Sequence, residues 1–519
     1  MGTLSFLILI PLLGALVLAV GRNLPDDSAR RISLLVSIVT LVVSLFLLVD
    51  LRAFELSAEY RFVENLSWIP GLNIRYHLGI DGLSLWLIIL STFLTPLALL
   101  GSWTSIEERV REFNIFILLL EAAMIGVFCA LDLFLFYVFW EAMLIPMYFL
   151  IGIFGHGRKI YAAVKFFLYT MAGSALMLVA FLVLYRAVGM QTFQIPDLVQ
   201  HVVDPSLQRW LFIAFALAFA IKVPMFPFHT WLPDAHVEAP TAGSVILAGV
   251  MLKMGGYGFL RLAIPLFPNA AVEAMPYIAL LGAIGIVYGA LVSLVQPDLK
   301  KLVAYSSVSH LGFVMLGLAA FQPMSMVGAS YQMLNHGVST GALFLMVGML
   351  YERRHTRLIS EFGGLRNVMP RFAAVFLLVC LSSIAVPGFN GFIGEFLILV
   401  GAFPSAPKLV IFSTLGVILS AAYILWMVQR VMYGEVTNPK NANLPDLSLR
   451  EWVTLTPLVF LALFMGVFSS YFTPSLERPI EQIIRQANSA TDRFGVGRPS
   501  APRSLANPTA EGTGEGGTE

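Results

Sequence analysis

The fold of this chain depends on the stretch Ala220-Ile221-Lys222-Val223-Pro224-Met225-Phe226-Pro227-Phe228-His229, where a lysine and two prolines interrupt an apolar segment. A charged side chain near the middle of a bilayer costs about 2.5–3.5 kcal/mol on insertion scales. Proline also removes a backbone donor where no water can replace it. Pro224 and Pro227 therefore predict a broken membrane helix, and Lys222 beside the break indicates a functional site.

The composition of the whole chain supports this interpretation. Of its 519 residues, 58% are hydrophobic and only 12% are charged, and the mean hydropathy is +0.83. These values are typical of an all-α polytopic membrane protein, whose main surroundings are the lipid bilayer. Cys129 and Cys380 both lie in apolar runs, so no disulfide, zinc or iron–sulfur site is expected. No nucleic-acid partner is expected.

Stretches of 18 or more mostly apolar residues predict about fourteen transmembrane helices. The seventh is broken at Pro224 and Pro227. The twelfth is broken at Pro387, Gly388 and Gly391, just before Glu395. Broken helices in corresponding places of two halves indicate two inverted five-helix repeats.

The expected organisation follows from these spans. We predict helices 1–3 over 1–112, a first repeat (helices 4–8) over 113–265, a second repeat (helices 9–13) over 270–435, helix 14 over 436–475 and a disordered tail over 476–519. The tail prediction depends on its Pro, Gly, Ser, Thr and charged residues. Arginine and lysine gather in alternate loops, as at Arg158, Lys159, Lys300 and Arg353, which predicts that both termini lie outside.

Ionisable residues inside the predicted spans are candidates for an ion pathway. They are Glu121, Glu141, Lys165, Lys222, Lys253, His310, His336 and Glu395. Glu141 and Lys222 could form a purely structural ion pair. However, two ammonium groups, Lys222 and Lys253, near one carboxylate cannot both be neutralised, so one is expected to exchange its proton readily. This reasoning favours a proton relay.

Polar faces on two adjacent spans could connect these groups. Gln332, Asn335, His336 and Ser339 recur at three- and four-residue spacing, and Ser306 and His310 are four apart. A single histidine is more often a satisfied core residue. Two histidines on faces that also carry serine favour the wall of a hydrated channel.

Three other features are assigned secondary or structural roles. Lys165 lies close to Arg158 and Lys159, so its ammonium is expected to reach the membrane interface. Glu121 could instead be a protonated, hydrogen-bonded acid that joins helices. The cluster His229, Asp234, His236 and Glu238 is expected to be a shaped connector and to bind no metal, because prolines surround it.

Two motifs resemble those of a known family. Phe228-His229-Thr230-Trp231-Leu232-Pro233-Asp234-Ala235-His236-Val237-Glu238-Ala239-Pro240 and Ala304-Tyr305-Ser306-Ser307-Val308-Ser309-His310-Leu311-Gly312 resemble signatures of the antiporter-like subunits of respiratory complex I and of Mrp-type antiporters. The resemblance covers residues 1–475 and implies that Glu141, Lys222, Lys253 and Glu395 are the main relay groups. Glu395 stands where sister subunits carry lysine.

The resemblance implies proton translocation coupled to NADH oxidation and quinone reduction in other subunits. FMN, iron–sulfur clusters and quinone are expected in those partners, and no cofactor in this chain. The expected partners are the neighbouring membrane-arm subunits, and the expected location is a bacterial cytoplasmic membrane. Two alternatives stay open: an Mrp-type sodium/proton antiporter subunit, and a structural membrane subunit that does not pump.

Overall fold

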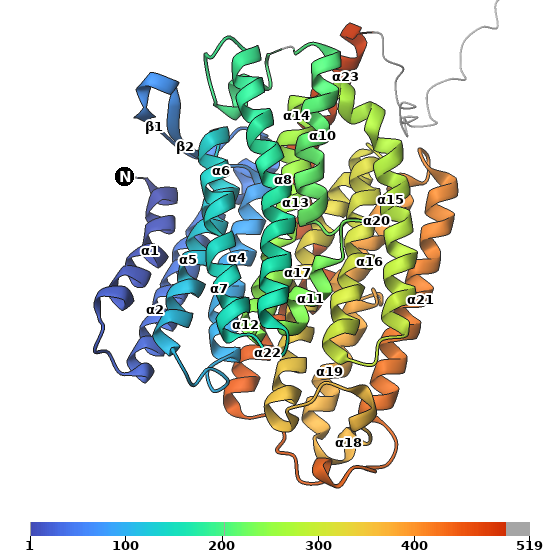
Figure 1. The fold of residues 1–519 in the computed structure, drawn as a ribbon. Coiled ribbons are helices and arrows are strands. Elements are labelled where there is room, and N and C mark those ends of the chain that lie inside the picture. Colours follow the sequence, from blue (N-terminus) through green and yellow to red (C-terminus); the bar gives the residue numbers. More distant parts are fainter. Residues whose placement is uncertain (1, 202, 495–519) are drawn as a thin grey trace, which may run out of the picture.

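The structure of the protein is a computed structural model that describes residues 2–201 and 203–494. Long helices run side by side as one bundle (Figure 1), and α1 lies at one edge of it. The first segment contains α1 (Thr3–Val20), α2 (Asp26–Leu45), η1 (Phe46–Asp50), α3 (Leu51–Leu56), β1 (Arg61–Ile69), η2 (Pro70–Leu72), β2 (Ile74–Ile80) and α4 (Gly82–Gly101).

The middle of the chain is helical and contains the first break. Its elements are α5 (Val110–Cys129), α6 (Leu133–Ala142), α7 (Leu144–Phe154), α8 (Lys159–Ala187), α9 (Ile195–Leu198), α10 (Pro205–Lys222), α11 (Trp231–Glu238), α12 (Thr241–Ile246), η3 (Leu247–Met251), α13 (Lys253–Gly258), η4 (Phe259–Ala263) and α14 (Ile264–Leu266). Both η3 and η4 are π-helical. The elements from α12 to α14 form one continuous membrane helix with two wide turns.

The rest of the described chain contains the second break. Its elements are α15 (Pro268–Leu294), α16 (Leu299–Ala319), α17 (Pro323–Arg354), η5 (Ile359–Glu361), α18 (Leu365–Val368), α19 (Pro370–Ser383), α20 (Asn390–Ala402), α21 (Pro407–Met432), η6 (Pro439–Asn441), α22 (Leu449–Val467), η7 (Ser469–Tyr471) and α23 (Thr473–Phe494). The central helix is α17, which packs against α4, α12, α16, α19, α20, α22 and α23.

Twelve helices of the described chain are long and apolar enough to cross a membrane. The polytopic all-α fold class is therefore confirmed. The two predicted breaks separate shorter helices: α10 ends at Lys222 before α11, and α19 ends at Ser383 before α20. Gly388 lies in the second break with φ of +96°, a region that glycine adopts without steric cost. The count of fourteen spans and the inverted repeats stay predictions.

A β-hairpin lies between α3 and α4, where the sequence predicted only helices and loops. Its strands β1 and β2 are antiparallel, with Glu64 opposite Leu78 and Leu66 opposite Tyr76. The Glu64 carboxylate accepts hydrogen bonds from the backbone N–H groups of Gly2, Leu4 and Ser5, at 2.8–3.0 Å. These donors have no partner within α1, so the hairpin caps the first helix.

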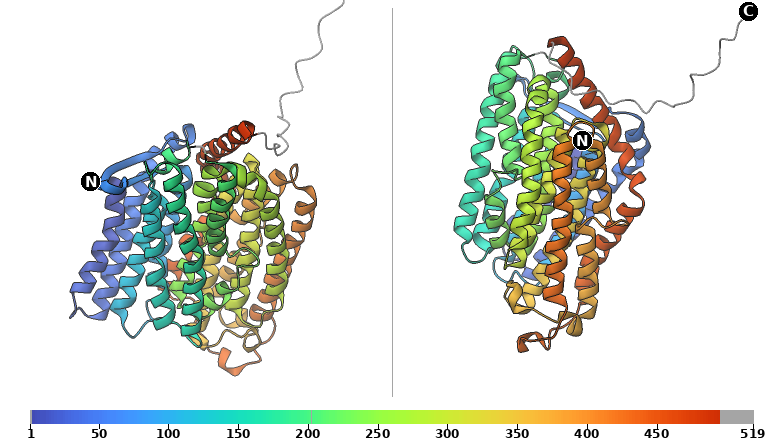
Figure 2. Two further views of the ribbon diagram at one scale, coloured as in Figure 1. Left: turned by 45° about the horizontal axis from the view of Figure 1, so that its top comes forward. Right: turned by 90° about the vertical axis from the view of Figure 1, so that its right-hand side faces the viewer.

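The predicted disordered tail is wrong for its first part, because residues 473–494 form α23. Leu476, Ile480, Ile483 and Ala487 are buried at three- and four-residue spacing, so they form one apolar face. Figure 2 shows α23 lying across the end of the bundle where the hairpin and the N-terminus lie. The prediction failed because the tail is polar on average, although these few apolar residues are spaced to form one face of a helix. Residues 495–519 lie outside the described residues.

Candidate functional site

Lys253 and His336 meet in the middle of the bundle. Lys253 begins α13, between the two π-helical turns, and His336 lies on α17. The Lys253 Nζ lies 2.7 Å from His336 Nδ1 and also donates a hydrogen bond to the carbonyl oxygen of Ala248 in η3. Lys253 is fully buried and His336 is only 3% exposed. π-helical turns often occur at functional sites.

A second buried pair joins α16 to α20. His310 Nδ1 lies 2.9 Å from Glu395 Oε1, and Gln332 Nε2 donates to the same carboxylate oxygen at 3.2 Å. His310 and Glu395 are each 3% exposed. Asn335 Nδ2 donates to Gln332 Oε1 at 3.0 Å, so the polar face of α17 holds the carboxylate in place.

The two pairs form one row. The rings of His310 and His336 are 6.1 Å apart between centroids, and His336 Nε2 has no hydrogen-bond partner. Four groups from four helices therefore follow one another in the order Lys253, His336, His310 and Glu395. Each group can hold or release a proton, which is what a lateral relay requires.

Ser339 and Ser306, the secondary polar candidates, take different positions. Ser339 Oγ lies 2.8 Å from Ser382 Oγ, and Ser382 donates to Asn390 Oδ1 at 2.6 Å. This chain of hydroxyl and amide groups joins α17 to both sides of the second break. Ser306 donates to the carbonyl of Val303 at 2.7 Å, within its own helix.

The structural ion pair that the sequence allowed between Glu141 and Lys222 is not formed. Lys222 Nζ has no hydrogen-bond partner and lies 5.3 Å from the ring centroid of Trp140 and 5.8 Å from that of Phe166. Glu141 is partly exposed, and its Oε1 has no partner either. Lys222 is the last residue of α10, where the helix dipole and the two aromatic faces favour a cation. These interactions replace the expected contact.

Lys165 and Glu121, two secondary candidates, have surroundings that the sequence did not predict. Lys165 Nζ forms an ion pair with Asp234 at 2.6 Å, and the two side chains are 19% and 39% exposed. This contact joins α8 to the connector helix α11, to which the sequence assigned only a shaping role. The expected position of Lys165 at the membrane interface stays a prediction. Glu121 is fully buried on α5, and neither of its carboxyl oxygens has a hydrogen-bond partner, so the alternative role of a hydrogen-bonded acid between helices is not seen.

Two further buried groups, His236 and Lys300, were not predicted as relay candidates. His236 is fully buried on α11, neither ring nitrogen has a hydrogen-bond partner, and its ring stacks on Phe344 at 4.6 Å. Lys300 was assigned to a loop but lies in the first turn of α16, where its Nζ donates to the carbonyl of Ala239 at 2.6 Å. Asp298 caps α16 two residues earlier, and that capping signal places Lys300 inside the helix.

Metal binding has no geometric support in the part of the chain that the structure describes, where no three His, Cys, Asp or Glu side chains lie together as metal ligands. Cys129 and Cys380 are buried and far apart in the sequence, and neither forms a disulfide. The row itself brings together amine, imidazole and carboxylate groups, which can exchange protons.

An all-α membrane bundle with interrupted helices and a buried row of titratable groups defines an ion-translocating membrane subunit. Residues 130–421 match the family model described as NADH:quinone oxidoreductase/Mrp antiporter, TM. Residues 6–130 match the model for the amino terminus of NADH-ubiquinone oxidoreductase chain 4. The chain therefore belongs to the NADH:quinone oxidoreductase/Mrp antiporter family, which confirms the resemblance seen in its motifs.

Within that family the chain is similar to subunit M, also called chain 4. It is 46% identical to NADH-quinone oxidoreductase subunit M of Rhodobacter capsulatus over 501 residues, which cover 93% of this chain and 96% of the relative. It is 43% identical over 483 residues to NADH-ubiquinone oxidoreductase chain 4 of Marchantia polymorpha, with coverages of 93% and 97%. It also matches a chain of respiratory complex I from Thermus thermophilus, with a TM-score of 0.85, 33% identity and coverages of 93% and 99%.

Proposed function

We propose that this chain is the membrane-arm subunit that moves protons in an NADH:quinone oxidoreductase, and that Lys253, His336, His310 and Glu395 are its relay. The observation that carries the proposal is the row itself, with contacts of 2.7 Å at one end and 2.9 Å at the other. The chain acts as part of a translocase and carries out no redox chemistry of its own.

Each step of the relay uses a contact in the row. The Lys253 ammonium gives a proton to His336 Nδ1, and the amine that remains is ready to accept another. The imidazolium of His336 then releases a proton from Nε2 toward His310, across the 6.1 Å between ring centroids, a separation that a water molecule can bridge. His310 Nδ1 passes a proton to the Glu395 carboxylate, and Gln332 holds that carboxylate in place.

Glu141 and Lys222 provide a charge switch beside the row, because α10, which ends at Lys222, packs against α13, which begins at Lys253. In the structure they are separated, and both have atoms without a hydrogen-bond partner. Bringing the carboxylate to the ammonium would stabilise both charges and so change the proton affinity of Lys253 in the row. Moving one charge against 100 mV takes about 2.3 kcal/mol, which is comparable to forming or separating one partly desolvated ion pair.

The partner subunits and the membrane location follow from the proposed function. Electron transfer would take place in partner subunits that hold flavin, iron–sulfur clusters and quinone, and neighbouring antiporter-like subunits would lie against this one. We infer a bacterial cytoplasmic membrane with both termini outside. In support, α1 begins and α23 lies at the same end of the bundle (Figure 2), whereas Arg158, Lys159 and Arg353 lie in or beside loops that the charge rule places inside.

The test is a comparison of proton pumping with electron transfer in the intact complex. Glu395→Gln and Lys253→Met should lower the number of protons moved per NADH oxidised while assembly and quinone reduction persist. Arg209→Gln is a matched control, because Arg209 pairs with Glu273 on the exposed surface. An unchanged proton-to-electron ratio in both relay variants would exclude the relay. Retained cation exchange without NADH oxidation or partner subunits would favour the Mrp-type alternative.

A further inference from the structure

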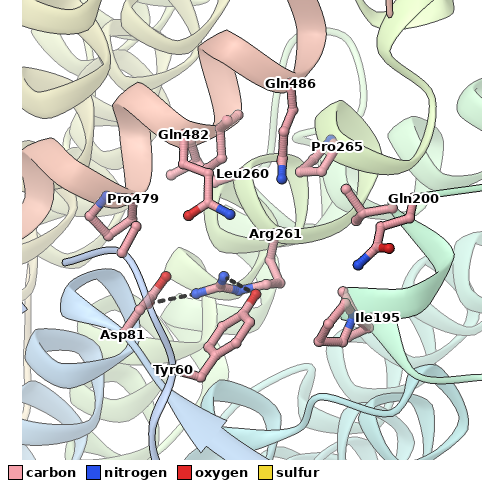
Figure 3. A pocket seen from close by; sticks show the side chains of 14 residues that line it. Tyr60, Asp81, Ile195, Gln200, Leu260, Arg261, Pro265, Pro479, Gln482 and Gln486 are labelled. Carbon is pink, nitrogen blue, oxygen red and sulfur yellow. Dashed lines mark hydrogen bonds and ion pairs between the residues drawn. The ribbon is translucent and has the colours of Figure 1, made fainter. Parts of the chain in front are cut away.

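A second group of buried charges lies away from the row, at the end of the bundle that carries the hairpin and α23. It borders a cavity of about 160 Å³ (Figure 3). The polar side chains that line this cavity come from five separate parts of the chain: Tyr60, Asp81, Gln200, Arg261, Gln482 and Gln486. A polar cavity of this size has room for several water molecules.

The floor of the cavity is an ion pair. Arg261 Nη2 lies 2.6 Å from Asp81 Oδ1, and Arg261 Nη1 donates to the Tyr60 hydroxyl at 2.9 Å. Arg261 is 6% exposed and Asp81 only 2%. Burial raises the pKa of the Tyr60 hydroxyl, and the Arg261 charge opposes that shift. Tyr60 is therefore a neutral hydroxyl at physiological pH.

Two hydroxyl groups lie beside this ion pair. Arg261 Nε donates to the Tyr257 hydroxyl at 3.1 Å. That hydroxyl lies 3.0 Å from Ser84 Oγ and 3.1 Å from the carbonyl oxygen of Phe128, to which it donates. Tyr257 is four residues after Lys253 in α13, so the two side chains share a face of the helix, one turn apart. Lys253 and Arg261, which lines the cavity, thus lie on the same membrane helix.

The arrangement differs from a structural anchor in two respects. A buried ion pair usually adds little net stability compared with apolar packing, because both charges lose their water. An ion pair that only anchors two helices also needs no polar cavity beside it. Nor does it need nearby hydroxyl groups such as those of Tyr257 and Ser84. Here Asp81 already has a structural role, since it accepts the Leu83 and Ser84 N–H groups as the N-cap of α4, and that role does not involve Arg261.

We propose that this cavity is a solvent vestibule through which Lys253 exchanges protons at the hairpin end of the bundle, with the Asp81–Arg261 pair as the gate. This inference rests on the proposed function of Lys253.

The transfer balances as a series of proton hops. The Lys253 side chain turns from His336 toward Tyr257 and gives a proton to the tyrosine oxygen. Tyr257 releases its own proton to Ser84. The Ser84 hydroxyl then turns to Asp81, whose Oδ1 already accepts the Ser84 backbone N–H at 3.1 Å, and passes a proton to that carboxylate. Protonation of Asp81 removes the negative charge that holds Arg261. The freed acid then gives its proton to water in the vestibule, and the pair closes again. Arg261 acts here as a positioning residue.

The first test opens the gate. Asp81→Asn combined with Arg261→Gln removes both charges, so neither is left buried alone. In proteoliposomes that contain the intact complex without NADH, an imposed pH gradient should decay several-fold faster than with the unchanged complex. Adding Gln482→Trp to fill the vestibule should return the decay to its original rate, as should adding Lys253→Met. If the Asp81–Arg261 pair has only a structural role, the double variant should fail to assemble. It should then show no faster decay of the pH gradient that Gln482→Trp can reverse.

A second variant covers the case in which the double substitution fails to assemble. Tyr257→Phe removes one hydroxyl and leaves both charges in place. It should lower the number of protons moved per NADH several-fold at an unchanged rate of quinone reduction. An unchanged proton ratio in Tyr257→Phe, or a wild-type rate of gradient decay in an assembled double variant, overturns the vestibule. If Glu395→Gln still lowers the ratio in that case, the relay stands without the vestibule. If Glu395→Gln also has no effect, both proposals are wrong.

Discussion

His310 Nδ1 lies 2.9 Å from Glu395 Oε1, although 85 positions separate the two residues in the chain. Both are buried, and the carboxylate also accepts a hydrogen bond from Gln332. This contact connects α16 to the helix that follows the second break. It makes His310 the last imidazole before the terminal carboxylate of the row.

Replacing His310 tests whether this contact carries a proton or only packs the core. His310→Gln can still donate a hydrogen bond to Glu395 but cannot act as an acid or base near neutral pH. We expect proton pumping per NADH to fall about tenfold or more, because general acid–base groups contribute at least this much. His355→Asn is the matched control, since His355 is exposed with φ of +51°, a region that asparagine tolerates. Normal pumping in His310→Gln would mean that the ring is a packing group.

The stability of a Lys222 variant distinguishes a relay role from a structural role for this lysine. Removing one partner of a buried ion pair costs about 3–5 kcal/mol, because the other charge is left unpaired. Lys222 has no carboxylate partner within hydrogen-bond distance, so Lys222→Met should leave the melting temperature of the complex unchanged or slightly higher. The same variant should lose proton pumping. A large drop in melting temperature would instead support a structural ion pair with Glu141.

Arg353 and Glu451 supply the contrasting case of charges with a structural role. Their two contacts are 2.5 Å and 2.7 Å, and both side chains are nearly buried. Arg353→Ala should destabilise the protein by about 3–5 kcal/mol because Glu451 is left as a buried charge. Thermal unfolding in detergent measures this loss. The proton-to-electron ratio of the complex that does assemble should stay normal, and a reduced ratio would place this pair in the pathway.

Glu64 tests the link between the hairpin and the first helix. Its carboxylate accepts three backbone N–H groups at the start of α1, in the manner of an N-cap. Glu64→Ala should cost about 1–2 kcal/mol, the usual effect of losing such a cap. Protease cleavage in the loop between α3 and β1 should become faster, as followed by mass spectrometry. Glu59→Ala, which changes an exposed carboxylate in that loop, serves as the control.

The apolar face of α23 predicts how firmly this helix is held. Ile480 is fully buried, so Ile480→Ala should destabilise the packing of α23 by about 2–5 kcal/mol. Faster cleavage around residue 490 would report its release from the bundle. Arg478→Ala changes an exposed residue of the same helix and should have little effect. Equal cleavage rates in both variants would show that the buried face does not hold the helix.

Hydropathy, proline chemistry and helix periodicity were sufficient to predict the membrane class, the breaks near Pro224 and Pro387, and the polar face of α17. These features depend on neighbouring residues, so they can be read along the chain. Most contacts between residues far apart in the sequence could not be predicted from such local features. The sequence paired Lys222 with Glu141, but packing places it between two aromatic rings, and Lys165 pairs with Asp234.

The order of groups in the row likewise arises only when α13, α16, α17 and α20 pack together, because each group comes from a different helix. The same holds for Arg261, which meets its carboxylate partner, Asp81, only across the bundle. Local interactions thus specified which segments enter the membrane and where they break. Side-chain packing between segments specified which buried charges meet, because the low dielectric of the interior makes each charge depend on whichever polar group the fold brings within about 3 Å.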